Sequence, residues 1–546
     1  MTIVVPCHLV FYFEESVKIL IVIATVAIVT FAGAWFALGS YMFSGLSKLP
    51  GDIDISTWEE TDPISTRLGN VVGLNHGRGF AFLGIRYAEA PVEELRFMPP
   101  IPVKPWKKTY LATRFPNRAM QADGAPISRE PNSFEMSEDS LFLNIFTPLV
   151  EGNKRPVLVW IHGGSFLTGT GNGYVGTQLS SQGDVVVVSI NYRLGILGFL
   201  DLSGFDKAYA GSASNGIRDQ ILALKWVHDN IGDYGGDADN VTIFGESSGG
   251  TSVASLIAAP SADGLYHKAI IHSGAPVHAP PPDLRESLAD QLDVTTDQLL
   301  VTLRSMTAQE IIESQGNIQA QFGGIVDGTV VTRSSLQAIA DRGSEGVPII
   351  VGSNKDEGTL LSFLTPRFAY DMAGPFIADL ITAGKGSDAY IEALKSAYPD
   401  DSSREHYERI WNEMFRMNAV KVAEQASTTG AGSWVYRFDL PVQNSPLGTE
   451  LGATHGAEIF FTFNSFADSD IPYYDKADPK VSKLAETWSN TVIQFARMGD
   501  PNGAGLPEWP KYQPESRQTL ILDGNPRLLE DVDEKDRKRW QALGLL

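Results

Sequence analysis

The chain has 546 residues, 43% of them hydrophobic and 20% charged, which is the composition of a globular protein with room for a large core. Its formal net charge is −22 at pH 7. Nucleic acid and anionic membrane surfaces repel a chain of that charge, and no basic patch in the sequence offsets it. We therefore expect no nucleic-acid partner.

The first element predicted along the chain is an uncharged stretch near its N-terminus. Residues 19–39 are mostly Ile, Val, Ala, Phe and Leu. Their length fits a bilayer-spanning helix of about 20 residues better than a signal-peptide core of roughly 7 to 15 residues. We interpret them as an apolar anchor helix within residues 1–45, followed by one domain at residues 46–546. The protein would then be membrane-anchored in the secretory pathway or at the cell surface. A cleaved signal peptide, which makes the protein secreted, is the alternative.

The position of the cysteine limits which disulfides and metal sites the domain can contain. Cys7 is the only cysteine, and it precedes the apolar stretch. The domain can therefore form neither a disulfide nor a cysteine-based metal site.

Strands and helices alternate through the domain. Residues 66–87 carry short β-like runs separated by glycines, which predict an antiparallel edge. Further strands are predicted at residues 141–146, 157–161, 185–190, 241–245, 268–272 and 347–351. Helical segments between them predict a mostly parallel sheet flanked by helices on both faces.

A strand, a sharp turn and a helix are predicted around Ser247. The apolar run that begins at Val241 leads into Gly245-Glu246-Ser247-Ser248-Gly249, and a helical segment follows at once. Small residues two positions before and after a serine let strand and helix approach each other, as a nucleophile elbow requires. A glycine-rich turn is the alternative, because this pattern alone is weak in a chain with 52 glycines.

The segment His162-Gly163-Gly164-Ser165 follows the predicted strand at residues 157–161. Two glycines allow backbone N–H groups to approach a ligand closely, as an oxyanion hole requires. We expect donors from the N–H groups of Gly164 and Ser165, joined by Ser248, which follows the nucleophile. A tight turn without a binding role is the alternative.

A serine hydroxyl needs a base within hydrogen-bonding reach, usually a histidine oriented by an acid. His455 is the best placed of the nine histidines, because it lies in a glycine-flanked loop far downstream of Ser247. The acid is then expected between the two. Asp356 and Glu357 both follow the predicted strand at residues 347–351, and spacing does not choose between them. A solvated charged turn is the alternative there.

Seven motifs in this order resemble those of the type-B carboxylesterase family, which includes cholinesterases and fungal lipases. They are residues 137–144, 162–166, 191–193, 215–220, 244–250, 354–358 and 455–459. The resemblance covers about residues 66–495. It implies an α/β-hydrolase fold in a fungal-type member, and hydrolysis of small-molecule carboxylic esters through an acyl-enzyme intermediate, without cofactor or metal.

The resemblance also implies roles for single residues. It selects Glu357 as the acid of a triad with Ser247 and His455. Its implied oxyanion donors are Gly164, Ser165 and Ser248.

Some positions depart from the family pattern. Ser140 stands at a cysteine of the family signature, and Ala119 stands where its disulfide partner usually falls. We therefore expect the loop between them to be more mobile than in relatives with the disulfide. Ser248 stands where members often have alanine. Residues 119–140 contain no tryptophan, which disfavours a choline ester as substrate.

Other functions fit the same fold. A lipase or a detoxifying lactone or amide hydrolase would use the same triad. A non-catalytic adhesion protein on this fold is a hypothesis of another class. The presence of serine, histidine and acid together disfavours the adhesion protein.

Overall fold

The computed structural model of the chain describes residues 54–122, 134–150, 154–315, 322–384, 386–445, 450–467 and 471–546. The predicted anchor segment at residues 1–45, with its apolar stretch at residues 19–39, lies outside the described residues. No helix within the described ranges is long and apolar enough to cross a membrane.

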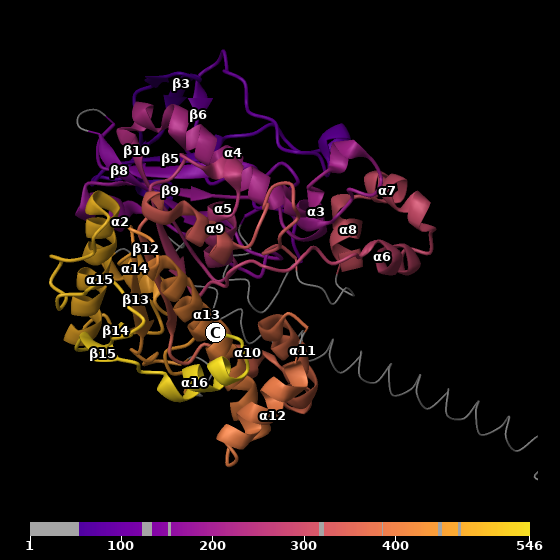
Figure 1. Ribbon diagram of the computed structural model, residues 1–546. Coiled ribbons are helices and arrows are strands. Elements are labelled where there is room, and N and C mark those ends of the chain that lie inside the picture. The colour runs from indigo at the N-terminus through magenta and orange to yellow at the C-terminus, as the bar shows by residue number, and fades with distance from the viewer. Residues whose placement is uncertain are drawn as a thin grey trace, which may run out of the picture.

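A twelve-stranded sheet forms the centre of the fold (Figure 1). In spatial order its strands are β1 (Glu59–Glu60), β4 (Leu74–Asn75), β5 (Phe80–Arg86), β7 (Phe142–Thr147), β9 (Val186–Ile190), β8 (Arg155–Ile161), β10 (Gly236–Glu246), β11 (Lys268–His272), β12 (Ile349–Asn354), β13 (Ser433–Phe438), β14 (Gln518–Leu522) and β15 (Arg527–Glu530). The strands from β9 to β14 pair in parallel, and both ends of the sheet are antiparallel. The mostly parallel sheet and the antiparallel N-terminal edge are therefore confirmed.

A second, small sheet lies beside the N-terminal end of the large one. It consists of β2 (Ile64–Thr66), β3 (Gly69–Val72) and β6 (Tyr110–Leu111).

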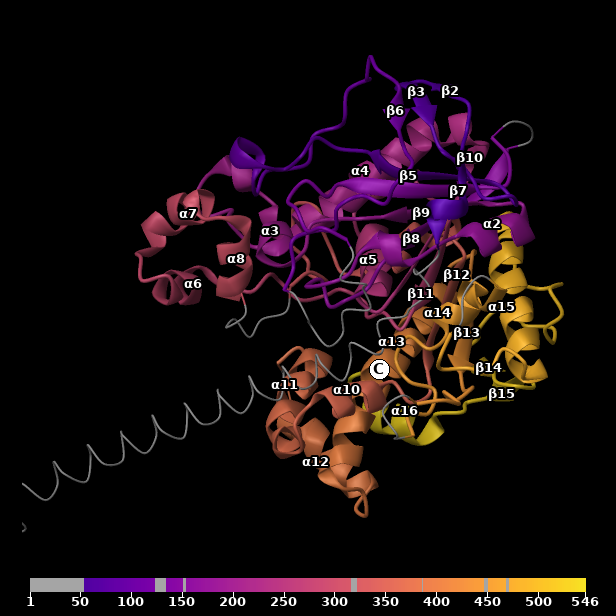
Figure 2. The same cartoon turned by 180° about the vertical axis from the view of Figure 1, so that it is seen from behind.

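Helices cover both faces of the large sheet, as Figures 1 and 2 show from opposite sides. The helices are α2 (Thr177–Gly183), α3 (Gly195–Phe199), α4 (Asn215–Asn230), α5 (Ser248–Ile257), α6 (Arg285–Gln291), α7 (Thr296–Ser305), α8 (Ala308–Gln315), α9 (Ser335–Arg342), α10 (Gly358–Leu364), α11 (Tyr370–Thr382), α12 (Ser387–Ala397), α13 (Ser403–Ser427), α14 (Ile459–Thr462), α15 (Pro479–Met498) and α16 (Glu534–Ala542). This arrangement confirms the prediction of a sheet flanked by helices.

The central strands are apolar on both faces because each face packs against helices. In β8, Val157 and Val159 belong to the core shared with α4, α5 and α9, whereas Leu158 and Trp160 belong to the core shared with α2 and α15. Successive side chains of a strand point to opposite faces, so one continuous apolar run serves two cores. The sheet thereby becomes a rigid base for the segments at its carboxyl-terminal edge.

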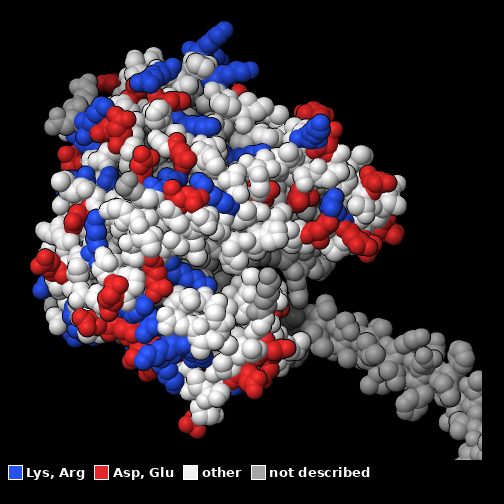
Figure 3. Space-filling model, viewed as in Figure 1, with Lys and Arg blue, Asp and Glu red and all other residues white. Residues whose placement is uncertain are grey.

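A third core joins α11, α12, α13 and α16 into a lobe at the lower side of Figure 1. Helix α13 belongs to two cores, because Ala419 and Ala423 pack beneath the sheet while Ile410 and Met417 pack in the lobe. On the face drawn in Figure 3, acidic and basic side chains are interspersed.

Candidate active site

Ser247 stands between the end of β10 and the first residue of α5, in a strained conformation with φ 58° and ψ −124°. The two glycines around it allow strand and helix to touch. A Cβ added to Gly245 would lie 2.6 Å from the backbone of Gly249, and one added to Gly249 would lie 2.1 Å from the carbonyl oxygen of Ile161. The predicted elbow is therefore present, and both of its glycines are sterically required.

His455 contacts Glu357, at a distance of 2.5 Å between Nδ1 and Oε2. The Glu357 side chain is fully buried. Its other oxygen, Oε1, accepts hydrogen bonds from the Asn354 N–H at 2.7 Å and from the Ser273 hydroxyl at 2.5 Å. Because both oxygens are engaged, the carboxylate has one orientation, and it holds the imidazole ring in place.

Asp356 faces a different partner from its neighbour Glu357. Its Oδ2 accepts a hydrogen bond from the Ala453 N–H at 2.9 Å, and its own N–H donates to the Ala453 carbonyl at 3.0 Å. Burial raises the pKa of the Asp356 carboxyl. Asp356 thus ties the end of β12 to the loop that carries His455, and it makes no hydrogen bond to the imidazole.

The imidazole of His455 is enclosed on its other sides. Its Nε2 lies 3.2 Å from Oε1 of Glu246, the residue before the nucleophile. Its ring stacks on Phe415 of α13, with centroids 4.7 Å apart and planes 28° apart. These contacts, together with Glu357, restrict the ring to a narrow range of orientations.

A cavity of about 60 Å³ joins the elbow, His455 and the oxyanion loop, defined as residues 162–166. Its apolar wall is formed by Tyr174, Leu361, Trp411 and Phe415. An apolar lining with a few polar groups is typical of sites for small organic ligands.

The oxyanion loop passes directly beside Ser247. A Cβ added to Gly163 would lie 3.1 Å from the Cβ of Ser247. Gly164 has φ +105°, and a Cβ added to it would lie 2.2 Å from the carbonyl oxygen of Thr168. The two glycines predicted for close approach are therefore both necessary.

The predicted oxyanion donors have no protein acceptor. Among the residues that the structure describes, none accepts a hydrogen bond from the N–H of Gly164, Ser165 or Ser248. Gly164 and Ser165 line the cavity beside Ser247, and the N–H of Ser248 opens α5, where helix geometry supplies no partner. Such donors suit an oxygen that gains negative charge.

Sequence reasoning missed two buried carboxylates, Glu246, which lines the cavity, and Glu458, which bonds to the end of β12. The Asn354 side chain donates to Glu458 Oε2 at 2.5 Å. Burial, with the negative charges of Glu246 and Glu357 nearby, raises the pKa of Glu458. Two signals in the sequence could have identified these carboxylates. Glu246 interrupts an apolar strand just before Ser247, and Glu458 follows His455 by three residues.

Two other histidines near the site are structural. His162 and His272 are fully buried, and burial lowers their pKa values to about 4 and about 3. His272 Nδ1 lies 2.6 Å from the Tyr436 hydroxyl. This contact within the core gives His272 a structural role.

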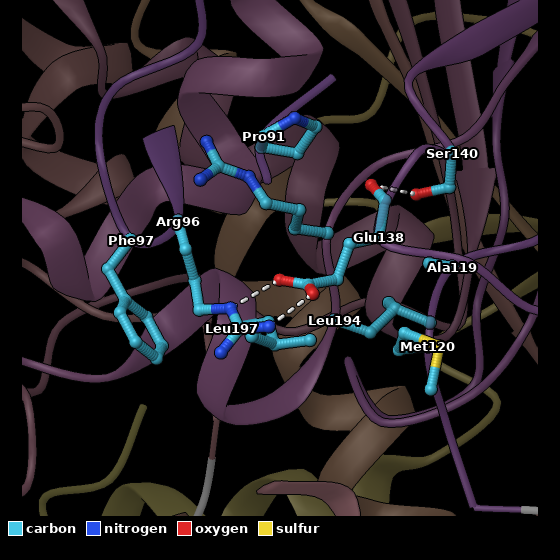
Figure 4. A pocket seen from close by; sticks show the side chains of 10 residues that line it. Pro91, Arg96, Phe97, Ala119, Met120, Glu138, Ser140, Leu194 and Leu197 are labelled. Carbon is cyan, nitrogen blue, oxygen red and sulfur yellow. Dashed lines mark hydrogen bonds and ion pairs between the residues drawn. The ribbon is translucent and has the colours of Figure 1, made fainter. Parts of the chain in front are cut away.

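Ala119 and Ser140 line one small cavity of about 10 Å³, shown in Figure 4. The ion pair of Arg96 and Glu138 crosses this cavity, with Arg96 Nε 2.7 Å from Glu138 Oε1. The two positions where the family pattern places cysteines thus open onto one space. Residues 123–133 of the loop between them, whose mobility was predicted, lie outside the described residues.

Known proteins resemble this chain over most of its length. The sequence model of the Carboxylesterase family matches residues 60–540. The para-nitrobenzyl esterase of Bacillus subtilis (strain 168) is 33% identical over 495 residues, which cover 87% of this chain and 98% of that protein. The cocaine esterase of Homo sapiens is 33% identical over 516 residues, which cover 86% of this chain and 89% of that protein.

Solved structures agree with the sequence comparison. The carboxylesterase EST55 of Geobacillus stearothermophilus aligns with a TM-score of 0.77 and 34% identity, over 88% of this chain and 100% of its own. A thermophilic para-nitrobenzyl esterase aligns with a TM-score of 0.77 and 31% identity, over 87% and 99% of the two chains. The family model matches nearly the whole described domain, and the relatives are similar in sequence and in their α/β-hydrolase fold. This chain therefore belongs to the carboxylesterase family.

Proposed function

We propose that this carboxylic-ester hydrolase works through an acyl-enzyme intermediate on Ser247, with His455 as base and Glu357 as the acid that orients it. The observation that carries the proposal is the 2.5 Å contact between His455 and the buried Glu357, because His455 lines the same cavity as the strained Ser247. Base, orienting acid and exposed nucleophile are the parts that acyl transfer requires.

Each step follows from this arrangement. The Ser247 oxygen attacks the ester carbonyl carbon, and its proton passes to Nε2 of His455. The carboxylate of Glu357 stabilises the imidazolium through Nδ1. The C–O bond to the alcohol then breaks, and the departing oxygen takes the proton from His455. Water, activated by the same base, hydrolyses the acyl-enzyme and restores Ser247.

The tetrahedral intermediate carries a negative oxygen, which the free N–H groups of Gly164, Ser165 and Ser248 are placed to bind. One such donor contributes about 3 to 4 kcal/mol to transition-state stability. The side chain of Glu246 lies on the other side of the imidazole, with Oε1 3.2 Å from Nε2.

Substitution of the nucleophile tests the proposal. Ser247→Ala should lower kcat for p-nitrophenyl acetate by about 10⁴-fold or more, because the triad acts as a unit. Ser255→Ala is the matched control, since Ser255 lies on the same helix and its hydroxyl bonds only to the Thr251 carbonyl. A Ser247→Ala enzyme that keeps more than about a tenth of wild-type kcat would refute the proposal.

The cavity favours short acyl groups and aromatic or small alkyl alcohols. Its wall of Tyr174, Trp411 and Phe415 provides flat apolar surfaces, and its volume is too small for a long acyl chain to be fully enclosed. The names of two relatives, para-nitrobenzyl esterase and cocaine esterase, describe esters with aromatic groups. In a series of p-nitrophenyl esters, kcat/KM should be highest at acyl chains of about two to six carbons. A maximum at ten carbons or more would indicate a lipase instead.

We also propose that residues 19–39 anchor the enzyme in a membrane, because they form an uncharged stretch of spanning length ahead of the described domain. Expressed with its native N-terminus, the full chain should remain in the membrane fraction after alkaline extraction. A chain that lacks residues 1–44 should be soluble and equally active. Recovery of soluble protein whose N-terminus begins near residue 40 would show a cleaved signal peptide.

A further inference from the structure

The hydroxyl of Ser248 joins the two halves of the active site. Its oxygen accepts a hydrogen bond from the N–H of Phe166 at 3.2 Å. Ser248 begins α5 next to the nucleophile, and Phe166 closes the oxyanion loop. Both residues are buried, with 7% and 4% of their surface exposed, so water does not reach this bond freely. Without the hydroxyl, the Phe166 N–H would be buried with no acceptor.

The other end of the oxyanion loop is held by Tyr192. The Tyr192 hydroxyl donates to the carbonyl oxygen of His162 at 2.8 Å. The Tyr192 ring also stacks on the His162 imidazole, with centroids 4.4 Å apart and planes 19° apart. Burial raises the pKa of Tyr192, and hydrogen bonding with the side chains of Ser248 and Ser252 opposes that rise. The loop is thus bonded at its first residue by Tyr192 and at its last residue by Ser248.

The loop needs such support because its own backbone is strained. Gly164, Ser165 and Phe166 have consecutive positive φ values of +105°, 58° and 60°. Side chains at positive φ are unfavourable, so Ser165 and Phe166 keep this conformation only if their surroundings impose it. Relaxation of Phe166 would rotate the peptide unit that joins it to Ser165, and the backbone of Ser165, with its N–H, would shift in response.

We propose that the Ser248 side chain is a positioning residue, whose hydroxyl fixes the distance between the oxyanion loop and the nucleophile. This inference rests on the proposed acyl-transfer function. The bond keeps the N–H groups of Gly164 and Ser165 directed at the place where the negative oxygen forms. It therefore acts on the transition state, whose oxyanion accepts much stronger hydrogen bonds than the ester carbonyl of the bound substrate.

Ser248→Ala tests this role in the full-length enzyme. Loss of a whole oxyanion donor typically lowers kcat about 10² to 10³-fold. In Ser248→Ala the donors remain but are misplaced, so kcat should fall only about tenfold. KM should stay within about twofold of wild type. The inhibition constant of an aryl trifluoromethyl ketone, which forms a tetrahedral adduct with the serine, should rise by the same factor as kcat/KM falls. The secondary alcohol obtained by reducing that ketone forms no adduct, so its dissociation constant should not change.

Ser252→Ala is the matched control. Ser252 lies one turn further along α5, is also buried and bonds to the Gln220 side chain at 3.0 Å, but it has no bond to the oxyanion loop. Its kcat and ketone inhibition should stay within about twofold of wild type. Tyr192→Phe, which removes the bond at the other end of the loop, should repeat the Ser248→Ala pattern: lower kcat, weaker ketone binding and unchanged alcohol binding.

The outcomes separate the inference from the function on which it rests. If Ser248→Ala keeps wild-type kcat and ketone affinity while Ser247→Ala is inactive, the positioning role is wrong and the acyl-transfer function stands. The positioning role is also wrong if kcat falls equally in Ser248→Ala and Ser252→Ala. It is wrong as well if the Ser248→Ala protein does not fold while Tyr192→Phe keeps wild-type kinetics. If Ser247→Ala stays active, the proposed function itself fails.

Discussion

Asp356 and Glu357 are neighbours in sequence with different tasks in the structure. Glu357 is fully buried and contacts the imidazole of His455, whereas Asp356 bonds to the backbone of Ala453 and so holds the loop on which His455 lies. Spacing along the chain leaves the two carboxylates equivalent. Three-dimensional placement separates them, because adjacent side chains leave the backbone in different directions.

The two carboxylates should therefore respond differently to neutral replacement. Glu357→Gln keeps the shape but removes the charge that stabilises the imidazolium, and should lower kcat about 10⁴-fold, as the comparable change does in a serine protease. Asp356→Asn should lower kcat about tenfold or less, through weaker support of the loop. Measurement of kcat for both variants at pH 8 checks this. If Asp356→Asn is the more damaging, the assigned triad acid is wrong.

At the scale of elements, the predictable parts are those with a strong local pattern. The apolar runs at residues 157–161, 185–190 and 268–272 became β8, β9 and β11, because strands buried on both faces read as continuous hydrophobic segments. The elbow, the oxyanion loop and the His455 loop were predictable for a similar reason, since close backbone approach leaves glycines in the sequence.

Other elements leave no such mark. Strands β13, β14 and β15 were not predicted, because their order at the sheet edge depends on pairing between distant segments. The cavity wall of Trp411 and Phe415 lies on α13, where aromatic residues look like ordinary core positions of a helix. Glu246 and Glu458 were missed because a buried carboxylate is recognisable only once its neighbours are known.

The small cavity between Ala119 and Ser140 predicts a gain in stability. Because both positions line it, the double variant Ala119→Cys with Ser140→Cys should form a disulfide under oxidising conditions. Closing a loop of about 20 residues should stabilise the fold by roughly 3 kcal/mol in the chain-entropy model. The check is the thermal midpoint with and without dithiothreitol, which should differ in the double variant and be equal in the parent. Two thiols that remain free after oxidation would show that the positions do not face each other.

At the scale of the whole molecule, the active site lies where separate cores meet. Ser247 and the oxyanion loop stand on the carboxyl-terminal edge of the sheet, while Phe415 and Trp411 come from α13, which is shared by the sheet core and the lobe of α11, α12 and α16. Cavity shape therefore depends on the packing of the lobe as well as on the sheet. Ligand sites at the carboxyl ends of parallel strands follow the general rule for open α/β sheets.

Buried histidines make the stability of the molecule depend on pH. Burial lowers the pKa of His162 to about 4 and that of His272 to about 3, whereas the unfolded chain binds these protons below about pH 6.5. Their contribution to stability is therefore complete above pH 6.5. It is lost as the pH falls below that value, by up to about 1.4 kcal/mol per pH unit for each histidine, until the folded pKa is reached.

Urea unfolding at pH 7 and pH 5 measures this loss. The free energy of unfolding should fall between the two pH values by more in the wild type than in His272→Gln, which keeps a polar side chain beside Tyr436 but no titrating group. Equal pH dependence in the two proteins would show that His272 is not held neutral by the fold.

The most direct test of the central claim is the location of a covalent adduct. An alkyl fluorophosphonate reacts with a serine only when a base activates it and an oxyanion hole receives the phosphoryl oxygen. Intact-mass measurement of the treated enzyme should show one adduct per chain, and peptide mapping should place it on Ser247, with loss of esterase activity in proportion. Prior saturation with a short-chain ester should slow the labelling. An adduct on another residue, or full esterase activity in a protein labelled at Ser247, would contradict the account.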